Sequence, residues 1–240
     1  MNLLLVEPSE LLPDGTCVLA DRRADHLRGV LGVAPGSIVR AGVVGGRIGT
    51  AEVLADDGRS LCLRVTADQP APPPLAVDLV LAVPRPKVLS RVIETCAAFG
   101  VRRIELTNAW RVDKSYLRSP RLAEAALAHA ARLGAEQGAT THLPAIRLHD
   151  RFMAMIDQPF EPATKLVAHP GSAFIEHVER PLPCVLAIGP EGGWIDRELA
   201  TFAERGFVAC SIGTPILRVE AAVSAGLAQL LVLGRRIRSG

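Results

Sequence analysis

The stretch Val185–Gly193, VLAIGPEGG, decides the fold that this sequence predicts. Its first four residues are apolar and typical of a short buried strand, and the run stops at a proline and three glycines. Glycine permits backbone conformations closed to other residues, and proline removes one backbone donor. An amphipathic helix is expected next, with Asp196 as N-cap and Gly206 just past its end. A strand, glycine-rich turn and helix in this order favour a ligand site in an α/β protein, although a plain connecting turn has the same pattern.

The sequence from residue 77 onward alternates between strand-like and helix-like segments. This alternation predicts an α/β domain, residues 77–240, with a mostly parallel sheet covered on both faces. The expected strands are Val77–Val83, Arg103–Thr107, Lys165–Ala168, Val185–Ile188 and Phe207–Ile212, and the expected helices lie between Val88 and Gly100, at Pro120–Gly138 and at Val219–Arg236.

Residues 1–70 have the pattern of a small β-barrel domain. Ser37–Val44 and Arg47–Leu54 are strand-like and flank a Gly45-Gly46 turn, and alternation around Leu61–Thr66 predicts another strand. A short helix is expected at Asp25–Leu31. The proline-rich residues 71–76 form a linker between the two domains.

Composition excludes several classes of protein. The chain is 49% hydrophobic and 22% charged, and it has no run of 18 apolar residues, so we expect no membrane span. The first residues lack the basic region of a signal peptide. Five scattered cysteines indicate a reducing, cytoplasmic setting rather than a disulfide framework. Neither the cysteines nor the six histidines have metal-ligand spacing, so we expect no metal site.

Positive charge gathers in one segment. Nine basic residues and three acidic ones lie within Arg85–Arg121, interleaved with Trp110 and Tyr116. Basic groups attract phosphates and aromatic faces stack on unpaired bases, so this segment favours nucleic-acid binding, although a solvated helix face would have the same charges. The RNA-binding candidates are Arg85, Lys87, Arg111 and Lys114, together with Arg22 and Arg28 from the first domain.

Three expected strands end in loops that can meet at one edge of the sheet. These loops follow Ala168, Ile188 and Ile212, and they offer backbone groups and few polar side chains. Such a pocket suits a cofactor with an adenine edge and apolar surface. There is neither a GxxxxGK[ST] nor a GxGxxG motif, which weighs against a triphosphate or dinucleotide. The cofactor-binding candidates are Ala168, His169, Ile188, Gly189, Pro190, Glu191, Gly192, Gly193, Ile212, Gly213, Ile216, Leu217 and Ala222.

The segments IGPEGG, SIG and ILRVEAA together resemble the SPOUT-type ribosomal RNA small subunit methyltransferase E family. Glu136-Gln137 also matches a pair that the family carries. The resemblance implies a PUA-like barrel followed by a trefoil-knotted methyltransferase domain, a homodimer, and S-adenosylmethionine-dependent N3-methylation of a uridine in 16S ribosomal RNA. We expect neither a bound metal ion nor association with a membrane.

The chemistry implied by the resemblance suggests roles for two residues. N3 of uracil is protonated and lies on the Watson–Crick edge, so the base must be unpaired and must lose a proton. Arg218 is the candidate for holding the base edge or a phosphate, and Glu220 for orienting Arg218 or accepting the proton. A structural ion pair at the start of a helix remains the alternative.

The chain departs from the family at Val219, Ala221 and Thr140, where the family usually has polar residues. These departures favour two alternatives: an RNA-binding protein of the same fold without transfer activity, and a different target nucleotide. Ribose 2′-O-methylation is a further alternative within the superfamily.

Overall fold

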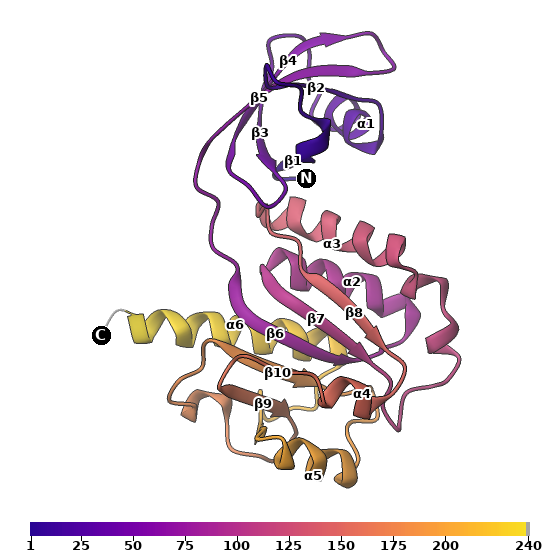
Figure 1. Cartoon of the computed structure of the whole chain (residues 1–240), viewed down its shortest axis with the longest axis vertical. Helices are drawn as coiled ribbons and strands as arrows, with labels where there is room; N and C mark the ends of the chain where they lie inside the picture. Colours follow the sequence, from indigo (N-terminus) through magenta and orange to yellow (C-terminus); the bar gives the residue numbers. More distant parts are fainter. Residues whose placement is uncertain (239–240) are drawn as a thin grey trace.

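A computed structural model describes residues 1–238, with side chains to residue 235. The chain forms two units joined by an extended segment (Figure 1). The first is a five-stranded sheet in the order β1-β3-β4-β5-β2. Its strands are β1 (Leu4–Val6), β2 (Thr16–Leu19), β3 (Ile38–Val43), β4 (Ile48–Asp56) and β5 (Leu61–Gln69), with the 3-10 turn η1 (Pro8–Glu10) and helix α1 (Arg22–Gly29) between them.

The first unit confirms the expected hairpin. β3 and β4 are antiparallel and paired from Ile38–Glu52 to Gly42–Ile48, whereas β1 runs parallel to β3. Helix α1 begins earlier than expected because the Asp21 side chain accepts a 2.9 Å hydrogen bond from the backbone N–H of Arg23 and caps it. Apolar side chains of these elements form a core of their own.

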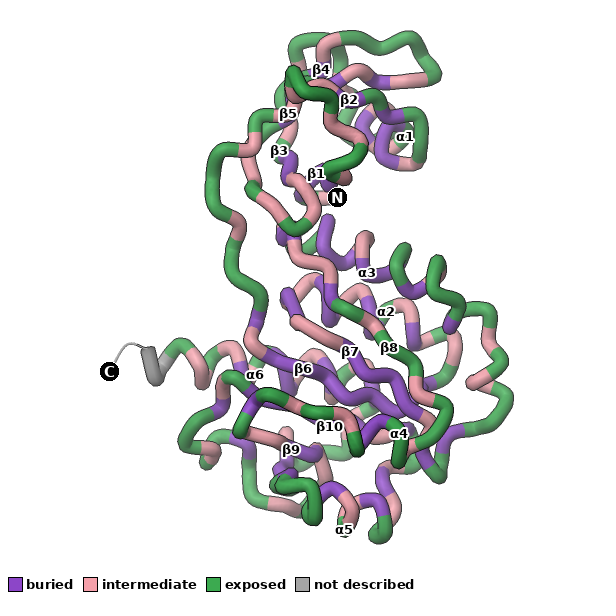
Figure 2. The backbone as a smooth tube through the Cα atoms, in the orientation of Figure 1, coloured by how far each residue is buried: buried purple, intermediate pink, exposed green. Residues whose placement is uncertain are grey.

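The second unit has a six-stranded sheet in the order β11-β9-β10-β6-β7-β8, and every adjacent pair is parallel. The prediction of a mostly parallel sheet is therefore confirmed. The strands are β6 (Leu75–Ala82), β7 (Val101–Thr107), β8 (Ala145–His149), β9 (Thr164–Ala168), β10 (Cys184–Ile188) and β11 (Val208–Cys210). β6 and β10 are buried almost throughout (Figure 2).

Helices cover both faces of this sheet (Figure 1). They are α2 (Pro86–Ala98), α3 (Glu124–Gly138), α4 (Phe152–Ile156), α5 (Asp196–Glu204) and α6 (Val219–Arg238), with short 3-10 turns η2 (Tyr116–Arg118), η3 (Pro120–Leu122) and η4 (Ile175–His177). Packing against β10 and α2 buries Leu227 and Leu230 of α6 completely, so these two residues belong to the core and not to an exposed face.

Several expected boundaries were wrong for local reasons. Asp196 is the first residue of α5 and Ile195 is its N-cap, because Glu198 reaches back to accept the Ile195 N–H at 3.0 Å. The helix expected from Pro120 begins at Glu124, since Ala123 is extended after a separate 3-10 turn. Strand β6 starts at Leu75, within the expected linker. β8 and α4 were not predicted.

No described helix is long and apolar enough to cross a bilayer. Within residues 1–238 no cluster of three or more histidine, cysteine, aspartate or glutamate residues could hold a metal ion.

Candidate cofactor and RNA site

Three loops at the carboxyl edge of the larger sheet enclose a cavity of about 360 Å³. They follow β9, β10 and β11, which are neighbours in the sheet. All thirteen cofactor-binding candidates line this cavity, and the remaining lining residues are Arg111, Pro170, Trp194, Ser211, Pro215 and Val219. The structure therefore brings together residues spread over more than fifty positions of sequence.

Hydrogen bonds to backbone carbonyls hold the three loops in place. The His169 N–H donates to the Cys210 carbonyl at 2.9 Å, which ties the first loop to the third. The Gln229 side-chain amide of α6 donates to the Ile212 carbonyl at 2.7 Å. In the middle loop the Gly193 N–H donates to the Pro190 carbonyl at 2.8 Å, with Gly193 in the left-handed region at a φ of 73°. These bonds fix the wall of the cavity before any ligand binds.

Two glycines of the middle loop pack closely against neighbouring side chains. A Cβ on Gly189 would lie 3.2 Å from Nε1 of Trp194, and one on Gly192 would lie 3.0 Å from Cδ of Arg111. An alanine at either position would push its neighbour aside, so the glycines shape the cavity as well as the turn.

Trp194 is a lining residue that the sequence interpretation missed. Its ring is 3% exposed and packs edge-on against Phe202, with 4.9 Å between the ring centres. Its Nε1 donor is buried without a partner among the described residues. A buried donor left unpaired costs free energy, and a ligand acceptor would remove that cost. The sequence signal that could have found it is its place directly after Gly193.

The two catalytic candidates lie beside the cavity rather than in its lining. Arg218 is exposed and directly precedes α6, and Glu220 is half-buried in the first turn of that helix. No ion pair joins the two side chains in the described part of the chain, so the arrangement in which Glu220 orients Arg218 is not formed here. Val219, between them, is 4% exposed and faces the cavity.

The basic candidates divide into two groups. Arg111 lines the cavity and donates to the Gly192 carbonyl at 2.5 Å, while the exposed Lys87 and Lys114 lie in neighbouring segments. Arg85 approaches Glu191 at 3.7 Å, and its backbone N–H donates to the same carboxylate at 3.1 Å. Arg85 and Arg111 thus contact the middle loop, and Lys87 and Lys114 lie two and three residues after them in the sequence.

Arg22 and Arg28 instead have carboxylate partners in the described structure. Arg22 donates two hydrogen bonds to Glu136 and Arg28 two to Asp56. Hydrogen bonding to Arg28 holds the pKa of Asp56 below its usual value. Both arginines thus have structural roles that the sequence did not reveal.

Outside the cavity lining, two carboxylates are buried, Asp78 on β6 and Glu105 on β7. Glu105 is fully buried and lies 2.6 Å from Nε2 of His149. Asp78 lies within 3.1 Å of Arg102 and 3.0 Å of Arg103. No sequence motif marked this network, which neutralises carboxylates in a low-dielectric interior.

The model of a family described as RNA methyltransferase domain matches residues 71–231. The chain belongs to this family. The resemblance noted in the sequence is confirmed by curated relatives named ribosomal RNA small subunit methyltransferase E. The one from Treponema pallidum is 27% identical over 96% of this chain and 91% of its own length. The one from Synechocystis is 26% identical over 96% of this chain and 77% of its own.

Solved structures of the family share the fold. The ribosomal RNA small subunit methyltransferase E of Neisseria gonorrhoeae, bound to S-adenosyl methionine, has a TM-score of 0.79 and 22% identity over 97% of this chain and 98% of its own. A putative methyltransferase of Legionella pneumophila, in complex with the same cofactor, has a TM-score of 0.81 and 22% identity over 96% of this chain and 97% of its own. Both units of the chain therefore follow a known architecture.

Proposed function

We propose that this protein transfers a methyl group from S-adenosylmethionine to N3 of a uridine in 16S ribosomal RNA of the small subunit. The observation that carries the proposal is the cavity at the carboxyl edge of the sheet, enclosed by three loops, with Arg111 in its lining and Arg85 beside Glu191. Membership of the RNA methyltransferase family, and the names of the curated relatives, support the substrate.

The cavity fits the proposed cofactor in size and chemistry. A volume of about 360 Å³ lies within the range of small-molecule sites. Ile188, Ile212 and Leu217 supply apolar walls, and the glycine-rich loop leaves backbone groups open to an adenine edge. The unpaired Nε1 of Trp194 is a further donor in the wall.

The reaction needs a deprotonated base held beside the cofactor. Bound S-adenosylmethionine supplies the methyl group. Arg218 has no side-chain partner among the described residues, so its guanidinium can reach the O2 or O4 edge and stabilise the imide anion. Glu220 lies two residues further on, in the first turn of α6, and is the candidate to accept the N3 proton. Neither role needs an ion pair between the two residues.

The RNA would approach over the basic residues around the middle loop. Arg85, Lys87, Arg111 and Lys114 attract phosphates, and Arg22 and Arg28 would add to this field from the N-terminal unit with the part of each guanidinium that its carboxylate leaves free. We assign residues 1–70 to a PUA-like RNA-binding domain, 71–76 to the linker and 77–240 to the methyltransferase domain. We place the protein in the cytoplasm, because an enzyme that methylates ribosomal RNA finds its substrate there.

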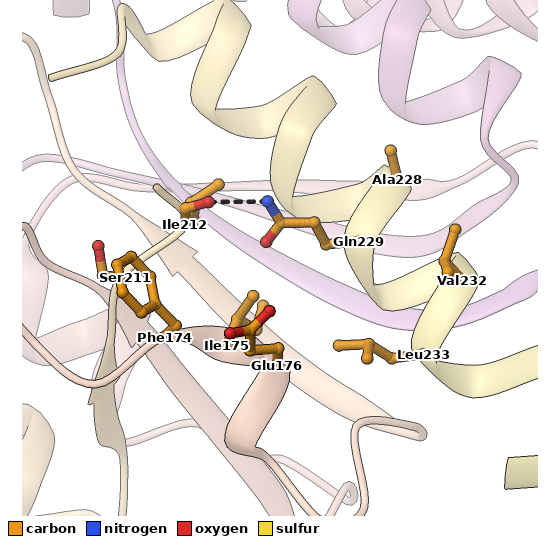
Figure 3. Close-up of a pocket in the computed structure, with 9 residues that line it drawn as sticks. All are labelled: Phe174, Ile175, Glu176, Ser211, Ile212, Ala228, Gln229, Val232 and Leu233. Atoms are coloured by element: carbon orange, nitrogen blue, oxygen red, sulfur yellow. Dashed lines mark hydrogen bonds between the residues drawn. The ribbon is translucent and has the colours of Figure 1, made fainter. Parts of the chain in front are cut away.

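We also propose the trefoil knot and the homodimer of SPOUT methyltransferases. The path of the chain after β11 supports the knot: Ser211 bridges to Phe174, and α6 then packs against β10, α2 and η4. The dimer is supported by a hollow between η4 and α6, where Phe174 and Val232 are 39% and 49% exposed (Figure 3). The Gln229 amide that donates to Ile212 has its oxygen buried there without a partner among the described residues.

Two measurements test the function. Isothermal titration calorimetry with S-adenosylmethionine is expected to show binding, and the absence of heat would favour the RNA-binding alternative without transfer. Mass-spectrometric mapping of ribosomal RNA from a strain lacking the protein is expected to show one uridine base without its methyl group. A methyl group missing from a ribose instead would make this a 2′-O-methyltransferase.

A further inference from the structure

Trp110 presents a large aromatic surface to solvent. Its side chain is 78% exposed, whereas Trp194, the other tryptophan, is 3% exposed. Single exposed apolar residues are common, so exposure alone has no functional meaning. The residues around Trp110 indicate a function for it.

The chain on both sides of Trp110 is anchored. Its backbone N–H donates to Glu198 of α5 at 2.9 Å, and this carboxylate is itself 6% exposed. Ala109 and Val112 are each 6% exposed, and the Val112 N–H donates to the Ala109 carbonyl at 3.0 Å. The backbone of the turn is therefore held in place while the indole projects into solvent, so little backbone entropy remains to be lost when the ring meets a ligand.

This turn stands at the rim of the cofactor cavity. Arg111, the next residue, lines the cavity and donates to the Gly192 carbonyl. Consecutive Cα atoms lie about 3.8 Å apart, so the indole is rooted within one residue of the cavity wall.

The charge of the turn is positive. Arg111, Lys114 and Arg118 lie in the eight residues that follow Trp110, with Asp113 as the acidic residue among them. The Asp113 carboxylate accepts the Ser115 backbone N–H at 2.8 Å, so it is turned back onto its own loop. An aromatic face beside cations is the combination that binds unpaired nucleotides.

We propose that Trp110 is the stacking platform on which an unpaired base of the RNA substrate rests at the mouth of the cavity. The proposal rests on the function proposed above and adds a residue that orients the RNA. Stacking on an aromatic side chain contributes enough that its removal weakens RNA binding roughly 5- to 100-fold. Because every base has a π-face, the residue positions the RNA and leaves recognition of uracil to hydrogen bonds.

Kinetics with small ribosomal subunits from a strain lacking the protein test the proposal. Trp110→Ala is expected to raise the KM for the subunit roughly 5- to 100-fold with kcat within about twofold. Trp110→Phe is expected to restore most of the affinity and Trp110→Leu is not, because leucine keeps apolar area without a π-face. Val208→Ala, at a residue 64% exposed on β11, is the matched control and should leave KM unchanged.

Fluorescence gives a readout independent of transfer. Oligouridylate is expected to quench the solvent-exposed emission of the wild-type protein, and Trp110→Phe is expected to lose that component. An unchanged KM in Trp110→Ala, rescue by leucine, or equal quenching in Trp110→Phe would overturn the proposal, and would leave Trp110 as a contact for another protein.

Calorimetry distinguishes a failure of the stacking role of Trp110 from a failure of the proposed methyl-transfer function. Trp110→Ala is expected to bind S-adenosylmethionine as the wild type does; a matching loss of cofactor affinity would show that it acts through Arg111 and the cavity wall, which contradicts stacking. If the wild-type protein neither binds the cofactor nor methylates subunits, the proposed function fails, whatever the quenching shows.

Discussion

Arg22 of α1 donates two hydrogen bonds, of 2.9 and 2.7 Å, to the carboxylate of Glu136 in α3. Glu136 is 1% exposed, and its backbone carbonyl also accepts the N–H groups of Asn2 and Leu3 at 3.0 Å each. Leu3, Leu5 and Ala135 are buried around this contact. One residue of the second unit thus receives side-chain and backbone donors from the first.

Arg22→Ala is expected to destabilise the protein by roughly 2–4 kcal/mol, because the mutation leaves a buried carboxylate unpaired. The lower part of the usual range applies since the Arg22 side chain is 35% exposed. Urea unfolding measures the loss. Arg64→Ala, which removes an exposed pair with Glu52, is the control and should change stability little. Equal losses in the two variants would contradict a special role for the Arg22–Glu136 contact.

Gly134→Ala is expected to weaken the packing of α2 on α3. An added Cβ would lie 2.1 Å from the Glu94 carbonyl oxygen, so the helices must separate, at a cost of about 1–3 kcal/mol or more. Gly29→Ala is the matched control, because it is a helical glycine with open space around it and should be neutral or stabilising by up to about 1 kcal/mol. Thermal unfolding distinguishes them, and a stable Gly134→Ala protein would show that the two helices can shift.

Arg218→Ala is expected to lower methyl transfer about 100- to 1,000-fold, the usual effect of removing one donor that stabilises a developing anion. Cofactor affinity should stay close to wild type, since Arg218 does not line the cavity. Single-turnover transfer and calorimetry measure the two quantities. Arg180→Ala is the control, because Arg180 lies far from the cavity. The Arg180 carbonyl accepts a hydrogen bond from the Thr164 hydroxyl, at the end of β9 opposite the cavity. Full activity of Arg218→Ala would remove the residue from the mechanism.

The cysteine thiols are expected to differ sharply in reactivity. Burial disfavours the thiolate and raises the pKa of Cys17 and Cys210 to about 11 and that of Cys184 to about 12, and it raises the pKa of Cys96 as well. Raising the pH from 7 to 9 therefore leaves these four protonated and unreactive.

Titration with Ellman's reagent at pH 8 should detect one thiol per native chain, the half-buried Cys62, and all five after denaturation. Rapid native labelling of Cys210 would show that the loop after β11 opens on the time scale of the reaction.

Local sequence patterns predicted much of this architecture. Apolar runs ending in glycine and proline placed the ends of β9, β10 and β11 within a few residues, because strand termination is a property of the backbone at those positions. The loops after these strand ends yielded thirteen of the nineteen residues that line the cavity. Helix starts were less predictable. Glu198 accepts the Ile195 N–H at the start of α5, and Ser119 caps a separate 3-10 turn, η3, ahead of α3.

Only the tertiary structure decided what depends on contacts between distant residues. The strand order β11-β9-β10 makes three separate loops neighbours, and no local pattern specifies that order. Arg22 and Glu136 are 114 residues apart in the sequence. From the sequence Arg22 was a candidate for binding RNA, whereas in the fold it pairs with the buried carboxylate of Glu136. Trp110 looked like one aromatic among basic residues until Glu198 was seen to hold its turn and Arg111 to reach the cavity. A sequence determines which groups a chain carries and where its backbone turns, whereas burial and pairing, which set what each group can bind, arise only when the elements pack.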